Sequence, residues 1–171
     1  MEDLENTDIK EYFGMDIEKR VEESLTEQIQ IVMPEHINGS GRLFGGKLME
    51  WIDIVSGVVA RRHSQYNVTT AAVDNLQFKA GAHLNDTLVL IGRITYVGNT
   101  SMEVRIDTYV ESMDGMRKPI NRAYFVMVAI DKDENPVRVP RLIVETESQR
   151  AEWEGGKKRT ELRKLRRKEG F

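Results

Sequence analysis

The chain has 171 residues, a length that suits one domain with tails, and 40% of its residues are apolar. Its net charge of −3 at pH 7 gives no reason to expect nucleic-acid binding, and the absence of cysteine excludes disulfides, thiolate zinc sites and a cysteine nucleophile. No apolar run approaches the ~18 residues of a membrane-spanning helix, and the acidic N-terminus lacks the order of an export signal, so the sequence predicts a cytoplasmic protein without membrane insertion.

Residues 1–23 form a predicted N-terminal extension, acidic with scattered apolar positions, for which a short packed helix and a mobile arm both remain open. The next stretch alternates between two kinds of side chain. Leu25, Ile29, Ile31 and Met33 fall on one face, and Thr26, Gln28 and Gln30 fall on the other. This alternation predicts a half-buried strand that ends at Pro34.

Residues 46–63 have the apolar spacing of a long helix. Its main stripe consists of Leu48, Trp51, Ile52, Val55 and Val59, and the stripe beside it consists of Met49, Asp53, Gly57 and Ala60. A helix that is apolar over so much of its surface is expected to be wrapped by other elements. Asp53 would then be a sheltered carboxylate, and such an acid is either paired structurally or used in chemistry. Position alone leaves both alternatives open.

Four further strands follow, at residues 68–78, 86–98, 101–111 and 120–131. Their short connections favour an antiparallel sheet around one helix, an α+β domain that spans residues 24–144. From residue 145 the chain is polar, helix-favouring and finally strongly basic. We interpret this C-terminal tail as a solvated helix or, alternatively, as a patch that attracts an anionic ligand.

Common ligand motifs do not fit the glycine-rich segment at residues 36–53. A dinucleotide fingerprint would need a third glycine where Phe44 stands, and a Walker A loop would need a hydroxyl after Lys47. The three histidines are scattered without ligand spacing, so no metal site is predicted. What remains is the pair Gly45 and Gly46 at a helix start, where bare backbone N–H groups favour negative charge on an oxygen.

The segments MPEHINGSGRLFGGKLMEWID, ARRH, VDNLQFKAGAHLNDTLVL and YVGNTSMEV resemble the acyl-CoA hydrolase branch of the hotdog-fold thioesterases. The resemblance covers about residues 25–140. It implies an antiparallel sheet wrapped around a long central helix, and the composition of the tail adds a helical C-terminal extension. It also implies a homodimer with one continuous sheet, assembled further into a hexamer as a trimer of dimers, with clefts between subunits as active sites.

The resemblance also implies roles for individual residues. Asp53 would be the catalytic acid and Asn38 the catalytic asparagine, contributed by opposite subunits, and the N–H groups of Gly45 and Gly46 would hold the thioester carbonyl. Further substrate-binding candidates are Met49, Trp51, Arg61, Arg62, Lys79, Asn99, Thr100 and Ser101. Relatives often place a basic residue where this chain has Asn99, which puts a phosphate contact there in doubt.

The predicted function is therefore hydrolysis of acyl-CoA to a free carboxylic acid and CoA, with Asp53 as general base or nucleophile. No cofactor is expected, because CoA is part of the substrate. The alternative is a non-catalytic hotdog module that binds or senses acyl-CoA. A hotdog hydratase is less favoured, because no histidine accompanies Asp53 on its helix face.

Overall fold

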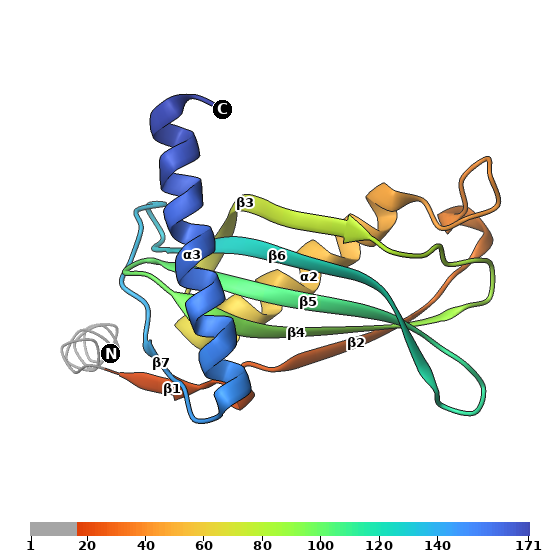
Figure 1. The fold of residues 1–171 in the computed structure, drawn as a ribbon, viewed down its shortest axis with the longest axis horizontal. Coiled ribbons are helices and arrows are strands. Elements are labelled where there is room, and N and C mark those ends of the chain that lie inside the picture. Colours follow the sequence, from red (N-terminus) through yellow and green to blue (C-terminus); the bar gives the residue numbers. More distant parts are fainter. Residues whose placement is uncertain (1–16) are drawn as a thin grey trace, which may run out of the picture.

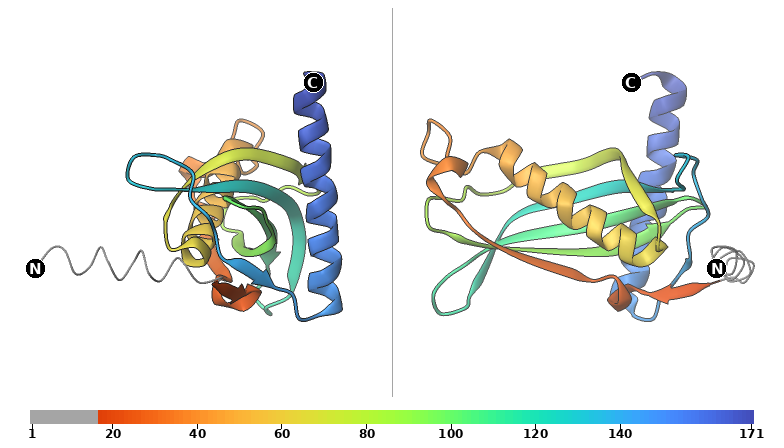
Figure 2. Two further views of the ribbon diagram at one scale, coloured as in Figure 1. Left: turned by 90° about the vertical axis from the view of Figure 1, so that its left-hand side faces the viewer. Right: turned by 180° about the vertical axis from the view of Figure 1, so that it is seen from behind.

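The computed structural model describes residues 17–171, and a curved sheet wrapped around one long helix dominates it (Figures 1 and 2). The helix is α2, Gly45–Ser64. The strands are β2 (Thr26–Ile31), β3 (Asn67–Phe78), β4 (Thr87–Val97), β5 (Ser101–Glu111) and β6 (Arg117–Ile130). They form a five-stranded sheet in the order β2-β4-β5-β6-β3, and every neighbouring pair is antiparallel. The predicted α+β hotdog architecture is confirmed.

The apolar stripe of α2 packs onto the concave face of the sheet, as predicted. Ile52, Val55 and Val59 are each at most 1% exposed and belong to the single hydrophobic core cluster. The approach is closest at Gly92 of β4, where a Cβ would lie 2.7 Å from Val55 Cγ1 and 2.9 Å from Val59 Cγ2. Glycine is required there because no side chain fits between strand and helix.

Strand β2 is present where the alternation predicts it, but its two faces are reversed. Ile29 and Ile31 are 57% and 54% exposed, whereas Gln28 and Gln30 on the inward face are half-buried. The inward register is fixed by Thr26, opposite Gly92, which is itself in contact with α2. The apolar residues therefore lie on the outer face of the sheet, where no other element of the described residues covers them.

A second, two-stranded sheet joins the described start of the chain to the segment before the last helix. Strand β1 (Glu18–Arg20) pairs in parallel with β7 (Arg141–Ile143), and the Arg141 N–H also donates to the Ile17 carbonyl at 2.8 Å. A short 3₁₀ helix, η1 (Val21–Glu23), leads into β2, and a second, η2 (Pro34–His36), follows it. The predicted extension covers residues 1–23: residues 18–23 form β1 and η1, and residues 1–16 lie outside the described residues.

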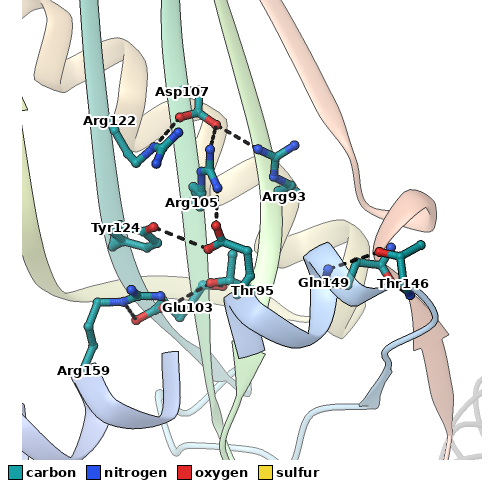
Figure 3. Close-up of polar contacts among 11 residues, drawn as sticks. Arg93, Thr95, Glu103, Arg105, Asp107, Arg122, Tyr124, Thr146, Gln149 and Arg159 are labelled. Atoms are coloured by element: carbon teal, nitrogen blue, oxygen red, sulfur yellow. Dashed lines mark hydrogen bonds and ion pairs between the residues drawn. The ribbon is translucent and has the colours of Figure 1, made fainter. Parts of the chain in front are cut away.

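Helix α3 (Glu147–Glu169) crosses the outer face of the sheet, and only its end projects beyond it (Figure 1). It begins with a capping box, in which Thr146 Oγ1 accepts from the Gln149 N–H at 3.1 Å (Figure 3). The interpretation as a freely solvated helix is wrong for its first half: Gly156 is buried against Tyr96 of β4, and the Trp153 ring packs on that of Tyr96 at 4.6 Å.

Buried ion pairs connect α3 to the sheet (Figure 3). Glu103 of β5 is 1% exposed and accepts from Arg159 at 2.8 Å and from Arg163 at 3.3 Å. Glu152 of α3 pairs with Arg105, which also contacts Asp107 at 2.8 Å. Because α3 and these pairs cover it, the polar face of β5 is buried at Glu103 and Asp107 and half-buried at Arg105.

The remaining strand limits agree with the prediction to within a residue, except at the start of β6. The expected turn at residues 113–119 is shorter, because β6 already begins at Arg117. Neither described helix is long and apolar enough to cross a membrane. The described residues also contain no group of His, Asp and Glu side chains that could hold a metal ion.

Candidate active site

A pocket of about 280 Å³ opens beside the N-terminus of α2. Its wall includes Asn38 and Arg42 from the glycine-rich loop, Gly45 from the helix start, and Phe78 and Lys79 from the end of β3. Of the predicted site residues, it brings together Asn38, Gly45 and Lys79. None of the residues that line it is an acid.

The amide of Asn38 is oriented by its own loop. Its Oδ1 accepts the backbone N–H groups of Ser40 at 2.9 Å and Arg42 at 3.2 Å, and the Asn38 N–H donates to the Arg42 carbonyl at 2.8 Å. Such turns around an asparagine stabilise tight loops. Within the described chain the Nδ2 group has no acceptor, so Asn38 presents a hydrogen-bond donor at the pocket.

The start of α2 carries backbone donors without acceptors. Phe44 occupies the N-cap position without a side-chain hydrogen bond, and the first turn contains no acid. The N–H groups of Lys47 and Leu48 bond to the Phe44 carbonyl, whereas those of Gly45 and Gly46 have no acceptor in the described residues. These free donors and the helix dipole favour an anionic oxygen at this position.

Gly46 is needed at this helix start because the ring of Phe44 lies across it. A Cβ on Gly46 would lie 2.6 Å from Phe44 Cε1, far inside van der Waals contact. A Cβ on Gly45 would meet the Phe78 ring at an ordinary 3.6 Å. The two glycines therefore sit between two aromatic rings that are each more than half exposed.

Asp53 lies two turns further along α2, outside this pocket. In the single chain it is exposed, which corrects the expectation of a sheltered acid, and it has no ion-pair partner in the described residues. Its Oδ1 accepts a hydrogen bond from Thr70 Oγ1 of β3 at 2.6 Å. Thr70 thereby fixes the carboxylate and leaves Oδ2 free to accept a proton.

Thr70 is a candidate that sequence reasoning missed. Thr69 and Thr70 are adjacent, and in a strand adjacent side chains point to opposite faces, so only the register decides which one reaches α2. That register shifts immediately afterwards, between Thr70 and Ala72. The available signal was a hydroxyl in the strand that follows the helix, which is weak on its own.

Asp53 and Thr70 line an open seam of the molecule. Strand β3 is the last strand of the sheet and has no further neighbour in the described chain. Beside it, α2 exposes Met49, Asp53 and Ile54, and in the view from behind no strand lies over this side of the helix (Figure 2). The seam therefore consists of the edge of β3 and a side of α2 that carries both apolar residues and Asp53, and both are open to solvent in the single chain.

The two apolar substrate candidates differ in environment. Met49 is 37% exposed on the seam. Trp51 is 5% exposed in the core, where its ring meets that of His36 edge-on with centroids 4.9 Å apart. Trp51 therefore supports the loop that carries Asn38 and does not face the pocket.

The remaining candidates lie at the opposite end of α2, which at 20 residues is about 30 Å long. Arg61 Nη2 donates to Asn67 Oδ1 at 3.3 Å, and Arg62 Nη1 donates to the Leu25 carbonyl at 2.9 Å. The two arginines thus link the end of α2 to the start of β3 and to the residue before β2.

The β4–β5 turn lies at this same end. The Asn99 carbonyl accepts the Val139 N–H at 2.9 Å and the Thr100 carbonyl accepts the Ala129 N–H at 3.0 Å. A Cβ at Gly98 would lie 2.6 Å from Ser101 Oγ, so a larger residue there would turn the Ser101 hydroxyl away. The site candidates therefore form two groups at the two ends of one helix.

Known proteins provide an independent comparison. The model of the thioesterase superfamily matches residues 40–115. The Bacillus subtilis protein YkhA, described as an uncharacterized acyl-CoA thioester hydrolase, is 35% identical over 128 residues, which cover 74% of each chain. A Zymomonas mobilis protein, also described as an uncharacterized acyl-CoA thioester hydrolase, is 38% identical over 112 residues, covering 64% of this chain and 74% of the relative.

Solved structures that superpose on this chain belong to the same class of enzyme as these relatives. A hexameric acyl-CoA thioesterase in its apo form superposes with a TM-score of 0.84 and 34% identity, over 88% of this chain and 97% of the other. The acyl-CoA hydrolase of Staphylococcus aureus was solved with butyryl-CoA, CoA and CoA disulfide. It superposes with a TM-score of 0.84 and 28% sequence identity, over 90% of this chain and 94% of the other. With its fold and with these relatives, the chain belongs to the acyl-CoA thioester hydrolase family of the thioesterase superfamily.

Proposed function

We propose that the protein hydrolyses acyl-CoA thioesters to a carboxylic acid and CoA at a site shared by two chains. One observation carries this proposal. The pocket beside Asn38 and the α2 N-terminus has hydrogen-bond donors and cations but no acid, whereas Asp53 stands exposed on an open seam. A second chain paired along β3 brings its own Asp53 to this pocket and covers the seam. Pairing therefore gives the pocket its acid and gives Asp53 a substrate pocket.

Each group has a definite chemical task in this site. The N–H groups at the start of α2 stabilise the oxyanion that develops on the thioester carbonyl, and one such donor is typically worth ~3 kcal/mol. Asn38 Nδ2 orients the carbonyl or the attacking water. Asp53, held by Thr70, takes the proton from water as a general base or attacks the carbonyl itself, and a positioned base contributes ~10²–10⁴-fold in rate.

Two cations without partners serve the phosphates of CoA. In the described residues neither the Arg42 guanidinium nor the Lys79 ammonium has a hydrogen bond or ion pair, and both line the pocket. Five further substrate-binding candidates lie at the C-terminal end of α2, away from the pocket: Arg61, Arg62, Asn99, Thr100 and Ser101. Met49 on the seam is a candidate acyl-chain contact, and Trp51 acts through the loop it supports.

Relatives support this assignment. Structures have been solved of the Staphylococcus aureus enzyme with an asparagine, an aspartate or a threonine replaced by alanine. These three positions have the same spacing along the chain as Asn38, Asp53 and Thr70. Since the apo neighbour is described as hexameric, we propose the same assembly here, a trimer of dimers.

We also propose that the reaction needs no cofactor or metal, because the groups above suffice for hydrolysis. A cytoplasmic location is proposed on the basis of the rat, mouse and human relatives named cytosolic acyl coenzyme A thioester hydrolase. The chain is 31% identical to them and covers 36–37% of their length.

The test is release of free CoA from short, medium and long acyl-CoAs by the wild-type protein and by Asp53→Asn. We expect turnover with at least one chain length and a loss of at least ~10²-fold in Asp53→Asn, because the amide cannot accept the proton. Asp133→Asn, an exposed turn carboxylate, is the matched control and should retain full rate. Binding without turnover across the panel would favour the non-catalytic module instead.

A further inference from the structure

The outer face of β2 is the apolar surface that the fold leaves uncovered on the side away from the seam. We define the β2 face as Leu25, Ile29, Ile31 and Met33, which are 43%, 57%, 54% and 45% exposed. They stand at every second position along β2 and its two flanks, and Glu27 interrupts the row between Leu25 and Ile29, so the continuous apolar part is Ile29, Ile31 and Met33. An exposed apolar row on an edge strand is an aggregation hazard unless something covers it.

The apolar surface continues across the neighbouring strands. Ile29 lies opposite Val89 of β4, and Val89 lies opposite Tyr109 of β5, on the same face. Val89 is fully buried, and Tyr109 is half-buried. The β2 face is thus the exposed margin of a larger apolar row.

Charged groups border this row. Arg117 at the base of the β5–β6 hairpin contacts Glu27 at 3.5 Å and Glu111 at 2.7 Å. The hairpin projects past β2, and its Met113 and Met116 are among the most exposed apolar residues described (Figure 1). An apolar centre with a polar rim is the anatomy of a protein–protein interface.

Within residues 17–171, no element of the chain covers this face. Helix α3 crosses the outer face of the sheet, and its contacts with the sheet are to β4, β5, β6 and β3, through Tyr96, Glu103, Tyr124 and Asp74. In the strand order β2-β4-β5-β6-β3, β2 is the edge opposite β3. A chain that pairs along β3 therefore leaves the β2 face exposed.

We propose that the β2 face packs against a second copy of this chain, in the contact that joins one dimer to the next. A trimer of dimers needs two different surfaces on each chain, one within the dimer and one between dimers. The seam along β3 serves the first, and the β2 face, with its apolar centre and rim of Glu27, Glu111 and Arg117, suits the second. The two carboxylates at the rim disfavour an anionic lipid surface as the occupant. This proposal goes beyond the catalytic function and rests on the dimer and the trimer of dimers proposed above, whereas CoA release tests the catalytic function separately.

The first experiment compares Ile29→Glu with Leu162→Glu by sedimentation velocity. Leu162, on α3, is a matched control because it is also 57% exposed in the single chain. We expect six chains for the wild type and Leu162→Glu, and two for Ile29→Glu, because a buried unpaired carboxylate disrupts an apolar contact. A wild-type protein of two chains, or an Ile29→Glu variant that keeps six, overturns the proposal.

The second experiment remains informative if Ile29→Glu does not fold. The sequence has no cysteine, so Ile29→Cys and Leu162→Cys each introduce a single thiol at sites of equal exposure in one chain. We expect the thiol at position 29 to react with a bulky maleimide about tenfold more slowly in the native assembly, because it reacts only when the contact opens. Both should react equally in denaturant. Equal rates in the native protein overturn the proposal.

Discussion

His63 is a buried titratable side chain that the catalytic proposal does not use. It is fully buried near the end of α2, where Nε2 lies 3.0 Å from the Pro140 carbonyl and donates to it, and Nδ1 has no partner in the described chain. Burial lowers the pKa of His63 below its usual 6.5, although the hydrogen bond to Pro140 partly opposes this shift. In the folded protein, burial therefore favours the neutral form of the His63 side chain.

This lowered pKa predicts a pH dependence of stability. The unfolded chain binds a proton at His63 near pH 6.5 and the folded chain only at lower pH, so the stabilisation is complete above about pH 6.5 and is lost as the pH falls below it. Urea unfolding of His63→Gln should show a flatter free energy of unfolding between about pH 6.5 and 5 than the wild type. An unchanged slope in His63→Gln would contradict the assignment.

At this scale the sequence could bring together only those site candidates that lie in one local motif. Asn38, Gly45 and Gly46 lie in one loop and one helix start, so their spacing alone brings them together. Thr70 and Arg42 were missed, because both are placed by tertiary packing. Thr70 depends on the register of β3, and Arg42 packs over Gly81, where a Cβ would lie 3.3 Å from Arg42 Cδ.

Helix α3 is the element whose docking depends most on one position. A Cβ on Gly156 would lie 2.5 Å from Tyr96 Cβ and 2.9 Å from Glu103 Oε1, so Gly156→Ala must push the helix off the sheet. Overpacking of this kind usually costs ~1–3 kcal/mol. We expect Gly156→Ala to lower the free energy of unfolding by that amount and to accelerate amide exchange in α3.

Gly155 provides a control of equal chemistry in the same turn of helix. A Cβ there would meet only Arg159 Nη1 at 3.2 Å, the far end of a flexible side chain. Because alanine favours helix over glycine by ~1 kcal/mol, Gly155→Ala should be neutral or stabilising. If both variants behave alike, the contact with Tyr96 does not hold α3 in place.

The positions of the strands and helices along the chain were largely predictable. Which face of a strand meets the core, and which helix covers the outer face of the sheet, were not. Periodicity locates a strand or helix, and a single alternating strand does not reveal which face meets the core. The inward glutamines of β2 follow from pairing with β4. The burial of α3 follows from arginines that meet Glu103 and Asp74, which are far away in the sequence.

At the scale of the whole molecule, a site shared by two chains predicts complementation between inactive variants. Asn38→Ala and Asp53→Asn should each be inactive alone. After subunit exchange at equal amounts, half of the dimers are mixed and each has one intact site, so about a quarter of the wild-type rate should return. The measurement is CoA release before and after verified exchange. No recovery would mean that each site is built from a single chain.

The parallel pairing of β1 with β7 determines where additions to the chain can be made. It places Glu18–Arg20 at the end of α2 that lies away from the loop of Asn38 (Figure 1). A fluorescent reporter attached at the exposed Glu18 would therefore leave the pocket mouth and the β3 edge unobstructed. Labelling at this strand is accordingly the attachment that suits assays of both substrate binding and subunit exchange.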